Sequence, residues 1–107
     1  MNLQANNPIS EQYRLSAKDW VEKDSAANLL EETKSAVLSQ MMARLGDIPV
    51  SHAERSVKSS DEWMDFVTKM VRAREAANLA KVRTEYIRMK FQEWSSFNAT
   101  KRAEMRL

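Results

Sequence analysis

The sequence predicts an all-α protein: a long antiparallel helical hairpin, or a small helical bundle, with a short connecting helix and a coiled-coil-like seam. Only one Gly and two Pro interrupt 107 residues, so few positions break a helix. The composition, 43% apolar and 30% charged, is typical of long amphipathic helices, and apolar residues recur at steps of three and four. The length fits a single domain over residues 1–107.

The first part of the chain predicts a loose arm followed by one long helix. Residues 1–15 are rich in Asn, Gln and Ser, and at most an early turn is expected there, after Asn7-Pro8. Ser16-Ala17-Lys18-Asp19 resembles a capping box, so a helix is predicted over 17–45. Its apolar stripe comprises Trp20, Ala27, Leu30, Val37, Leu38, Met41, Met42 and Leu45.

The end of this helix carries the strongest local signal in the chain. Arg44 places a cation in the last turn, Gly46 can adopt the left-handed conformation that ends many helices, and Pro49 follows shortly. The chain is therefore expected to reverse direction here. Ser51-His52-Ala53-Glu54 then matches a capping box and predicts a short helix over 51–58.

A second long helix is predicted over 60–96, with Ser59-Ser60-Asp61-Glu62 as its cap. Ser95, Ser96 and Asn98 compete for backbone hydrogen bonds, so a kink or fray is expected near them. Residues 99–107 then form either a separate turn or a continuation of the helix. Strict heptad spacing predicts a seam that serves either the core or self-association: Trp63, Phe66, Met70, Ala73, Ala77, Ala80, Thr84, Ile87, Phe91 and Trp94.

A second apolar row widens the stripe of this helix beyond what one antiparallel neighbour would cover. At about 1.5 Å per residue, the segment 61–94 would be a rod of roughly 50 Å, longer than a compact domain of this size. Three-helix packing or self-association is therefore expected. The row comprises Met64, Val67, Val71, Val82, Tyr86 and Met89.

Charge is distributed unevenly, although the net charge is only +2. From Lys69 to Leu107 there are ten Lys and Arg against four Glu, a local net charge of +6. One interpretation pairs these cations with acidic residues of the first helix, namely Glu22, Asp24, Glu31 and Glu32. The alternative is a phosphate-contacting, nucleic-acid-binding surface formed by Arg83, Arg88, Lys90, Lys101, Arg102 and Arg106.

Catalysis, metals and cofactors are not expected. The chain has no Cys and one His, and His52 has no partner that would make it a base or a ligand. One Gly cannot supply a phosphate-binding loop, and no activated Ser motif is present. No apolar run is long enough to span a membrane and no secretory signal is recognised, so a cytoplasmic location is expected.

The segment from Arg72 to Trp94, followed by Asn98 to Leu107, resembles the ends of small helical proteins encoded by tailed bacteriophages. The resemblance covers the C-terminal third of the chain. Such proteins often come from the early region, near recombination and replication genes. The resemblance implies an accessory role in that setting, inside a bacterial host cell, and it brings no catalytic residues with it.

The function predicted from these observations is that of a non-enzymatic accessory or adaptor protein. It is expected to form a homo-oligomer through its long helices and to bind another protein, in DNA recombination or replication. The alternative function is sequence-independent nucleic-acid binding by the basic C-terminal third.

Overall fold

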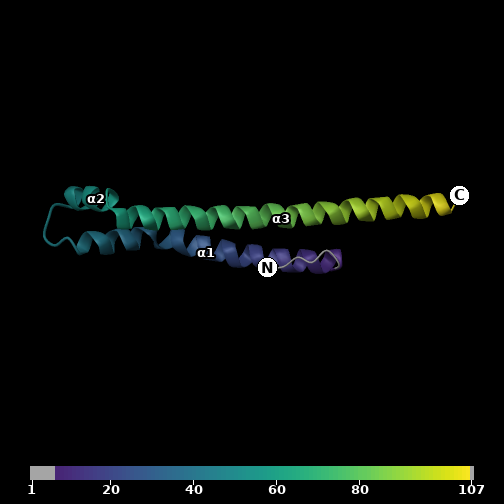
Figure 1. Cartoon of the computed structure of the whole chain (residues 1–107), viewed down its shortest axis with the longest axis horizontal. Coiled ribbons are helices and arrows are strands. Elements are labelled where there is room, and N and C mark those ends of the chain that lie inside the picture. The colour runs from purple at the N-terminus through teal and green to yellow at the C-terminus, as the bar shows by residue number, and fades with distance from the viewer. Residues whose placement is uncertain (1–6, 107) are drawn as a thin grey trace.

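The computed structural model describes residues 7–106 and shows three helices: α1 (Ile9–Ala43), α2 (Val50–Lys58) and α3 (Asp61–Met105). No strand occurs within this range. The long helices α1 and α3 lie side by side as an extended hairpin, and short α2 sits at the turn (Figure 1). The molecule measures 83 × 22 × 17 Å. The predicted all-α hairpin with a short connecting helix is confirmed.

Helix α1 begins eight residues earlier than predicted, at Ile9 instead of Ala17. Pro8 occupies the N-cap position, and its carbonyl accepts a hydrogen bond from the Gln12 amide at 3.0 Å. The predicted cap at Ser16 is wrong because that hydroxyl lies inside the helix and bonds to α3. Of the predicted loose arm, residues 7–15 are therefore ordered and mostly helical, whereas 1–6 lie outside the described residues.

The reversal after α1 occurs where the sequence predicts it. Helix α1 ends at Ala43, and Gly46 has a φ of +84°, the left-handed conformation that side chains disfavour. Helix α2 then begins at Val50, directly after Pro49. No side chain caps this start, so the predicted capping box beginning at Ser51 is wrong. Proline supplies the helix boundary instead, because it fixes φ and carries no N–H.

Two serines, Ser59 and Ser60, join α2 to α3, and Ser60 contacts both helices. The predicted cap lies at Ser60, one residue after the Ser59 expected from the sequence. The Ser60 hydroxyl accepts a hydrogen bond from the Trp63 amide at 3.2 Å and donates one to the Val57 carbonyl at 2.6 Å. It therefore satisfies one free group at the start of α3 and one at the end of α2.

Helix α3 continues without interruption to Met105, so the predicted end at residue 96 is wrong and the continuation over 99–105 is correct. One of the polar side chains expected to break the helix, Asn98, bonds back onto it instead. The Asn98 amide group donates to the Trp94 carbonyl at 3.1 Å. Since this contact leaves the backbone ladder intact, the helix passes through the segment straight, as Figure 1 shows.

Small residues let the two long helices approach closely. Ala27 of α1 and Ala77 and Ala80 of α3 are almost completely buried. Near them the buried hydroxyls of Ser16 and Thr84 lie 2.8 Å apart. Because Thr84 gives its only proton to the Ala80 carbonyl, at 2.9 Å, Ser16 must be the donor in the bond between the helices.

We expect this polar contact to set the alignment of the hairpin. Replacing Thr84 with Val keeps the shape but removes the acceptor, and should lower the free energy of unfolding by about 1 kcal/mol. Urea denaturation at a fixed protein concentration measures the change. Thr100→Val, the same substitution at an exposed helical position, is the control and should change stability far less. Equal effects of the two substitutions would contradict the role of the contact.

Candidate interaction surfaces

Arg74 on α3 is the main ionic link between the long helices. It makes a two-pronged contact with the Glu31 carboxylate, at 2.8 and 2.9 Å, and a third contact with Asp24 at 2.7 Å. The Asn28 side-chain oxygen accepts a fourth hydrogen bond at 2.6 Å. Asp24, Asn28 and Glu31 share one face of α1 because their spacing follows the helical turn. Arg74 therefore spans two turns of its neighbour.

The charges in this cluster shift each other's ionisation. Hydrogen bonding to Arg74 lowers the pKa of the Glu31 carboxyl below its ordinary value of 4.5, against a smaller opposing effect of desolvation. Hydrogen bonds to Glu31 and Asp24 raise the pKa of Arg74 above its ordinary value. Both groups therefore remain ionised at neutral pH, and the link persists there.

Arg83 contributes to the same interface, nine residues after Arg74 on α3. Its guanidinium lies 3.7 Å from the Asp19 carboxylate, which also contacts Lys23 of α1 at 2.8 Å. Of the six residues proposed from the sequence as nucleic-acid-binding, this is the one that the structure ties to α1. Within residues 7–106 no ion pair forms at the other five, which are Arg88, Lys90, Lys101, Arg102 and Arg106.

Three of these five cations, Lys101, Arg102 and Arg106, belong to the part of α3 that extends beyond α1. Arg88 and Lys90 lie before it, and Arg88 borders a hollow with Ile9 and Tyr13 of α1. Asn7 to Ser10, at the start of α1, line a shared hollow with Phe91 and Trp94, and α3 continues past this level (Figure 1). At about 1.5 Å per residue, 95–105 project roughly 16 Å further. We call residues 95–106 the tip. Phe97 and Met105 are exposed on it, 66% and 78% respectively.

The side of α3 that faces away from α1 carries a row of exposed apolar residues, which we call the outer face. Its members are between 47% and 66% exposed, whereas Ala77 and Ala80 toward α1 are buried. Monomeric proteins expose single apolar side chains commonly, but a continuous row usually marks a binding surface. The outer face comprises Met64, Val71, Leu79, Val82, Tyr86, Met89 and Phe97.

The seam predicted from the sequence divides into two parts. Its N-terminal and central residues face α1: Trp63, Ala77, Ala80, Thr84 and Ile87 are buried, and Phe66, Met70 and Ala73 are half-buried. Phe91 and Trp94, at the C-terminal end of the seam, are 45% and 56% exposed because they lie beside the first residues of α1, near Ile9, where its cover stops. The centroids of their rings lie 6.1 Å apart, and the two side chains form an exposed apolar patch next to the tip.

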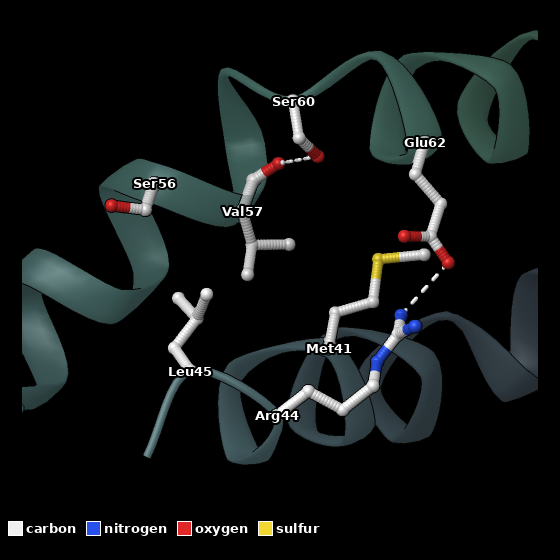
Figure 2. Close-up of a pocket in the computed structure, with 7 residues that line it drawn as sticks. All are labelled: Met41, Arg44, Leu45, Ser56, Val57, Ser60 and Glu62. Carbon is white, nitrogen blue, oxygen red and sulfur yellow. Dashed lines mark hydrogen bonds and ion pairs between the residues drawn. The ribbon is translucent and has the colours of Figure 1, made fainter. Parts of the chain in front are cut away.

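A hollow of about 220 Å³ lies at the corner where the three helices meet. Figure 2 shows Met41, Leu45 and Val57 directed toward it from α1, the turn and α2. An ion pair between Arg44 and Glu62, 2.8 Å long, crosses its rim. Its lining combines these three apolar side chains with Ser56, Ser60 and the Arg44–Glu62 pair.

Sequence reasoning missed the contacts that α1 makes before residue 16. Ile9 and Tyr13 border an apolar hollow with Phe91 of α3, and this packing explains why the expected arm is helical. Proline followed by an apolar residue and another four positions later was the available signal. The Ser16–Thr84 contact was signalled only by one Thr in an otherwise apolar seam.

The Arg74 cluster should make stability depend on pH. Because the folded pKa of Glu31 is lowered, its contribution is present above the ordinary value of 4.5 and is lost as pH falls through the folded pKa. We therefore expect Arg74→Gln to lower the melting temperature near pH 7, and the difference from the parent chain to shrink below pH 4.5. Thermal unfolding followed by circular dichroism measures both.

Arg72→Gln is the matched control, since Arg72 is exposed and forms no ion pair within residues 7–106. It should leave the melting temperature nearly unchanged at both pH values. A difference for Arg74→Gln that stays constant down to pH 3 would show that the carboxylates do not hold this arginine.

Comparisons with known proteins and searches for standard sites add no assignment. No group of three or more potential metal ligands occurs among the described residues, where His52 is exposed. Across that same part of the chain, no helix is sufficiently long and apolar to cross a membrane. Comparison with protein-family models, with curated proteins and with solved structures finds no match.

Proposed function

We propose that this chain is a non-enzymatic adaptor protein that self-associates through the outer face of α3 and binds a further protein. The observation that carries the proposal is the row of apolar side chains from Met64 to Phe97, which no element within residues 7–106 covers. A helix with two apolar faces, one covered by a neighbouring helix and one exposed, is typical of subunits in helical assemblies.

The shape of the molecule supports the same proposal. A compact monomer of 12.4 kDa would expose about 6,100 Å², and this chain exposes 8214 Å². Its radius of gyration is 22.9 Å, against about 13 Å for a compact chain of this length. The excess surface is larger than the roughly 800 Å² that one partner contributes to a standard interface.

For the further protein we propose a component of phage DNA recombination or replication. The support is the resemblance of residues 72–94 and 98–107 to small early-region phage proteins. That segment includes four of the seven outer-face residues, Leu79, Val82, Tyr86 and Met89, and the tip from Asn98 onward, so many of the resembling residues are exposed. Co-expression with candidate enzymes of that class, followed by co-elution of a defined complex, tests the assignment.

Self-association through the outer face predicts a specific mutational result. Val82→Glu places a charge in the middle of the row, and burying an unpaired charge is costly. The parent chain should elute as a defined oligomer by size-exclusion chromatography with light scattering, and the variant as a monomer. Helical content measured by circular dichroism should be unchanged, since Val82 is 60% exposed within the hairpin.

Leu29→Glu is the matched control. Leu29 is 64% exposed on α1, so the substitution has the same chemistry and similar exposure but lies away from the outer face. It should leave the oligomer intact. A parent chain that is monomeric at high concentration would contradict self-association, and so would an oligomer that Val82→Glu does not affect.

A second candidate function is sequence-independent binding of nucleic acid by the C-terminal part of α3, from Arg88 to Arg106. The specific observation in its favour is the division among the basic residues. Arg74 and Arg83 are held by carboxylates of α1, whereas the five cations from Arg88 to Arg106 are exposed and form no ion pair within the described range. Free cations of this kind neutralise phosphates and release counterions.

This candidate predicts affinity that decreases steeply with salt. Neutralising three tip cations together, Lys101→Gln, Arg102→Gln and Arg106→Gln, should reduce the slope of log affinity against log salt by about 2 for single-stranded DNA. Fluorescence anisotropy with a labelled oligonucleotide measures it. Lys34→Gln, Arg55→Gln and Lys58→Gln together remove the same charge elsewhere and should leave the slope unchanged. No binding at low salt would exclude this function.

A further inference from the structure

We propose that the partner of the outer face is a second copy of this chain, and that the two copies of α3 lie antiparallel. The inference rests on the proposed self-association and specifies its geometry. It places Met64 of one copy opposite Met89 of the other, and Val71 opposite Val82. The two-fold axis then crosses the contact between the two α3 helices at the level midway between residues 76 and 77.

The spacing of the row fits a long, straight contact. Met64 and Val82 are 18 residues apart, as are Val71 and Met89, and Leu79 and Phe97. Eighteen residues make about five complete turns of an α-helix, so each pair projects in the same direction. The row therefore runs parallel to the helix axis, and in this register the straight α3 of the second copy can follow it from Met64 to Met89.

The row is on the opposite side of α3 from α1, which leaves room for the second copy. Ala73 lies nine residues from both Met64 and Val82, a separation of about two and a half turns. It therefore points away from the row, and it belongs to the half-buried seam toward α1. The two copies can pair without disturbing either hairpin.

Charge favours the antiparallel arrangement. Asp61 and Asp65 lie beside the N-terminal end of the row, and Lys90 lies on the same flank near its other end. None of the three forms an ion pair within residues 7–106. Antiparallel pairing brings Lys90 of each copy between the two aspartates of the other. Parallel pairing would instead place this flank of the two copies on opposite sides of the contact, so Lys90 could not meet either aspartate.

The centre of the contact is also consistent with this register. Between Val71 and Val82, Glu75 and Asn78 are the polar residues that interrupt the row, and the axis between residues 76 and 77 places each opposite the other in the second copy. An amide can donate a hydrogen bond to a carboxylate there. Arg83, which this register brings near Arg72 of the second copy, is already directed to Asp19 of its own α1.

The absence of Cys from the sequence makes the geometry directly measurable. Three single variants, Met64→Cys, Asn78→Cys and Met89→Cys, are treated with a short bismaleimide after light scattering has established the oligomer. Asn78→Cys alone should cross-link, because it lies near the axis. Met64→Cys and Met89→Cys should each cross-link weakly alone, since identical positions are then about 38 Å apart, and strongly when mixed.

The controls separate this inference from the function on which it rests. Leu29→Cys on α1 should not cross-link. A dimer in which Met64→Cys alone cross-links efficiently would be parallel, which would overturn the inference and leave self-association standing. A dimer with no cross-link at any α3 position would contradict both the geometry and the face. A monomeric parent chain would contradict the proposed function itself.

The ionic contacts provide an independent test. Lys90→Glu should weaken the dimer by about fivefold, because two exposed pairs are lost by symmetry. Adding Asp65→Lys to the same chain should restore most of the affinity, as reversal of both charges recreates the pair. Sedimentation equilibrium measures the dissociation constants. Failure of the double variant to recover would show that Lys90 and Asp65 do not meet.

Discussion

The close approach of α1 and α3 is the constraint on which the rest of the structure depends. Short side chains at Ala27, Ala77 and Ala80 permit it, and the buried contact between Ser16 and Thr84 aligns the two helices along it. A shifted hairpin would separate the Ser16 hydroxyl from its acceptor on Thr84, and burying a hydroxyl without a partner is costly, so the shift is disfavoured. Once this alignment is set, Arg74 meets its three partners on α1 and the outer side of α3 is left uncovered.

The fold was largely predictable from the sequence because its signals are local and repeated. Heptad spacing, scarce breakers and the single Gly at 46 determine two long helices and one reversal. The errors concern places where a local signal competes with packing. Ser16 resembles a cap only when the opposite helix is ignored, and the Ser95–Asn98 segment resembles a break only when bonds back to the helix are ignored.

Surfaces were less predictable than helices. The sequence identifies which cations exist in the C-terminal third, but the partners of each depend on where α1 begins and how it aligns. Arg74 and Arg83 meet carboxylates because α1 runs beside them. Lys101 and Arg102 do not, because they lie beyond the N-terminal start of α1. The apolar row had a clear period in the sequence, and only the three-dimensional arrangement showed which side of α3 remains open.

The uninterrupted path of α3 has a mechanical consequence. Forty-five residues in one helix separate the Ser60 cap from the last turn at Met105 by about 66 Å. Such a helix behaves as a stiff spacer, because bending it would stretch many backbone hydrogen bonds together. A molecule bound at the tip and another bound at the three-helix corner would therefore be held at a nearly constant distance from each other.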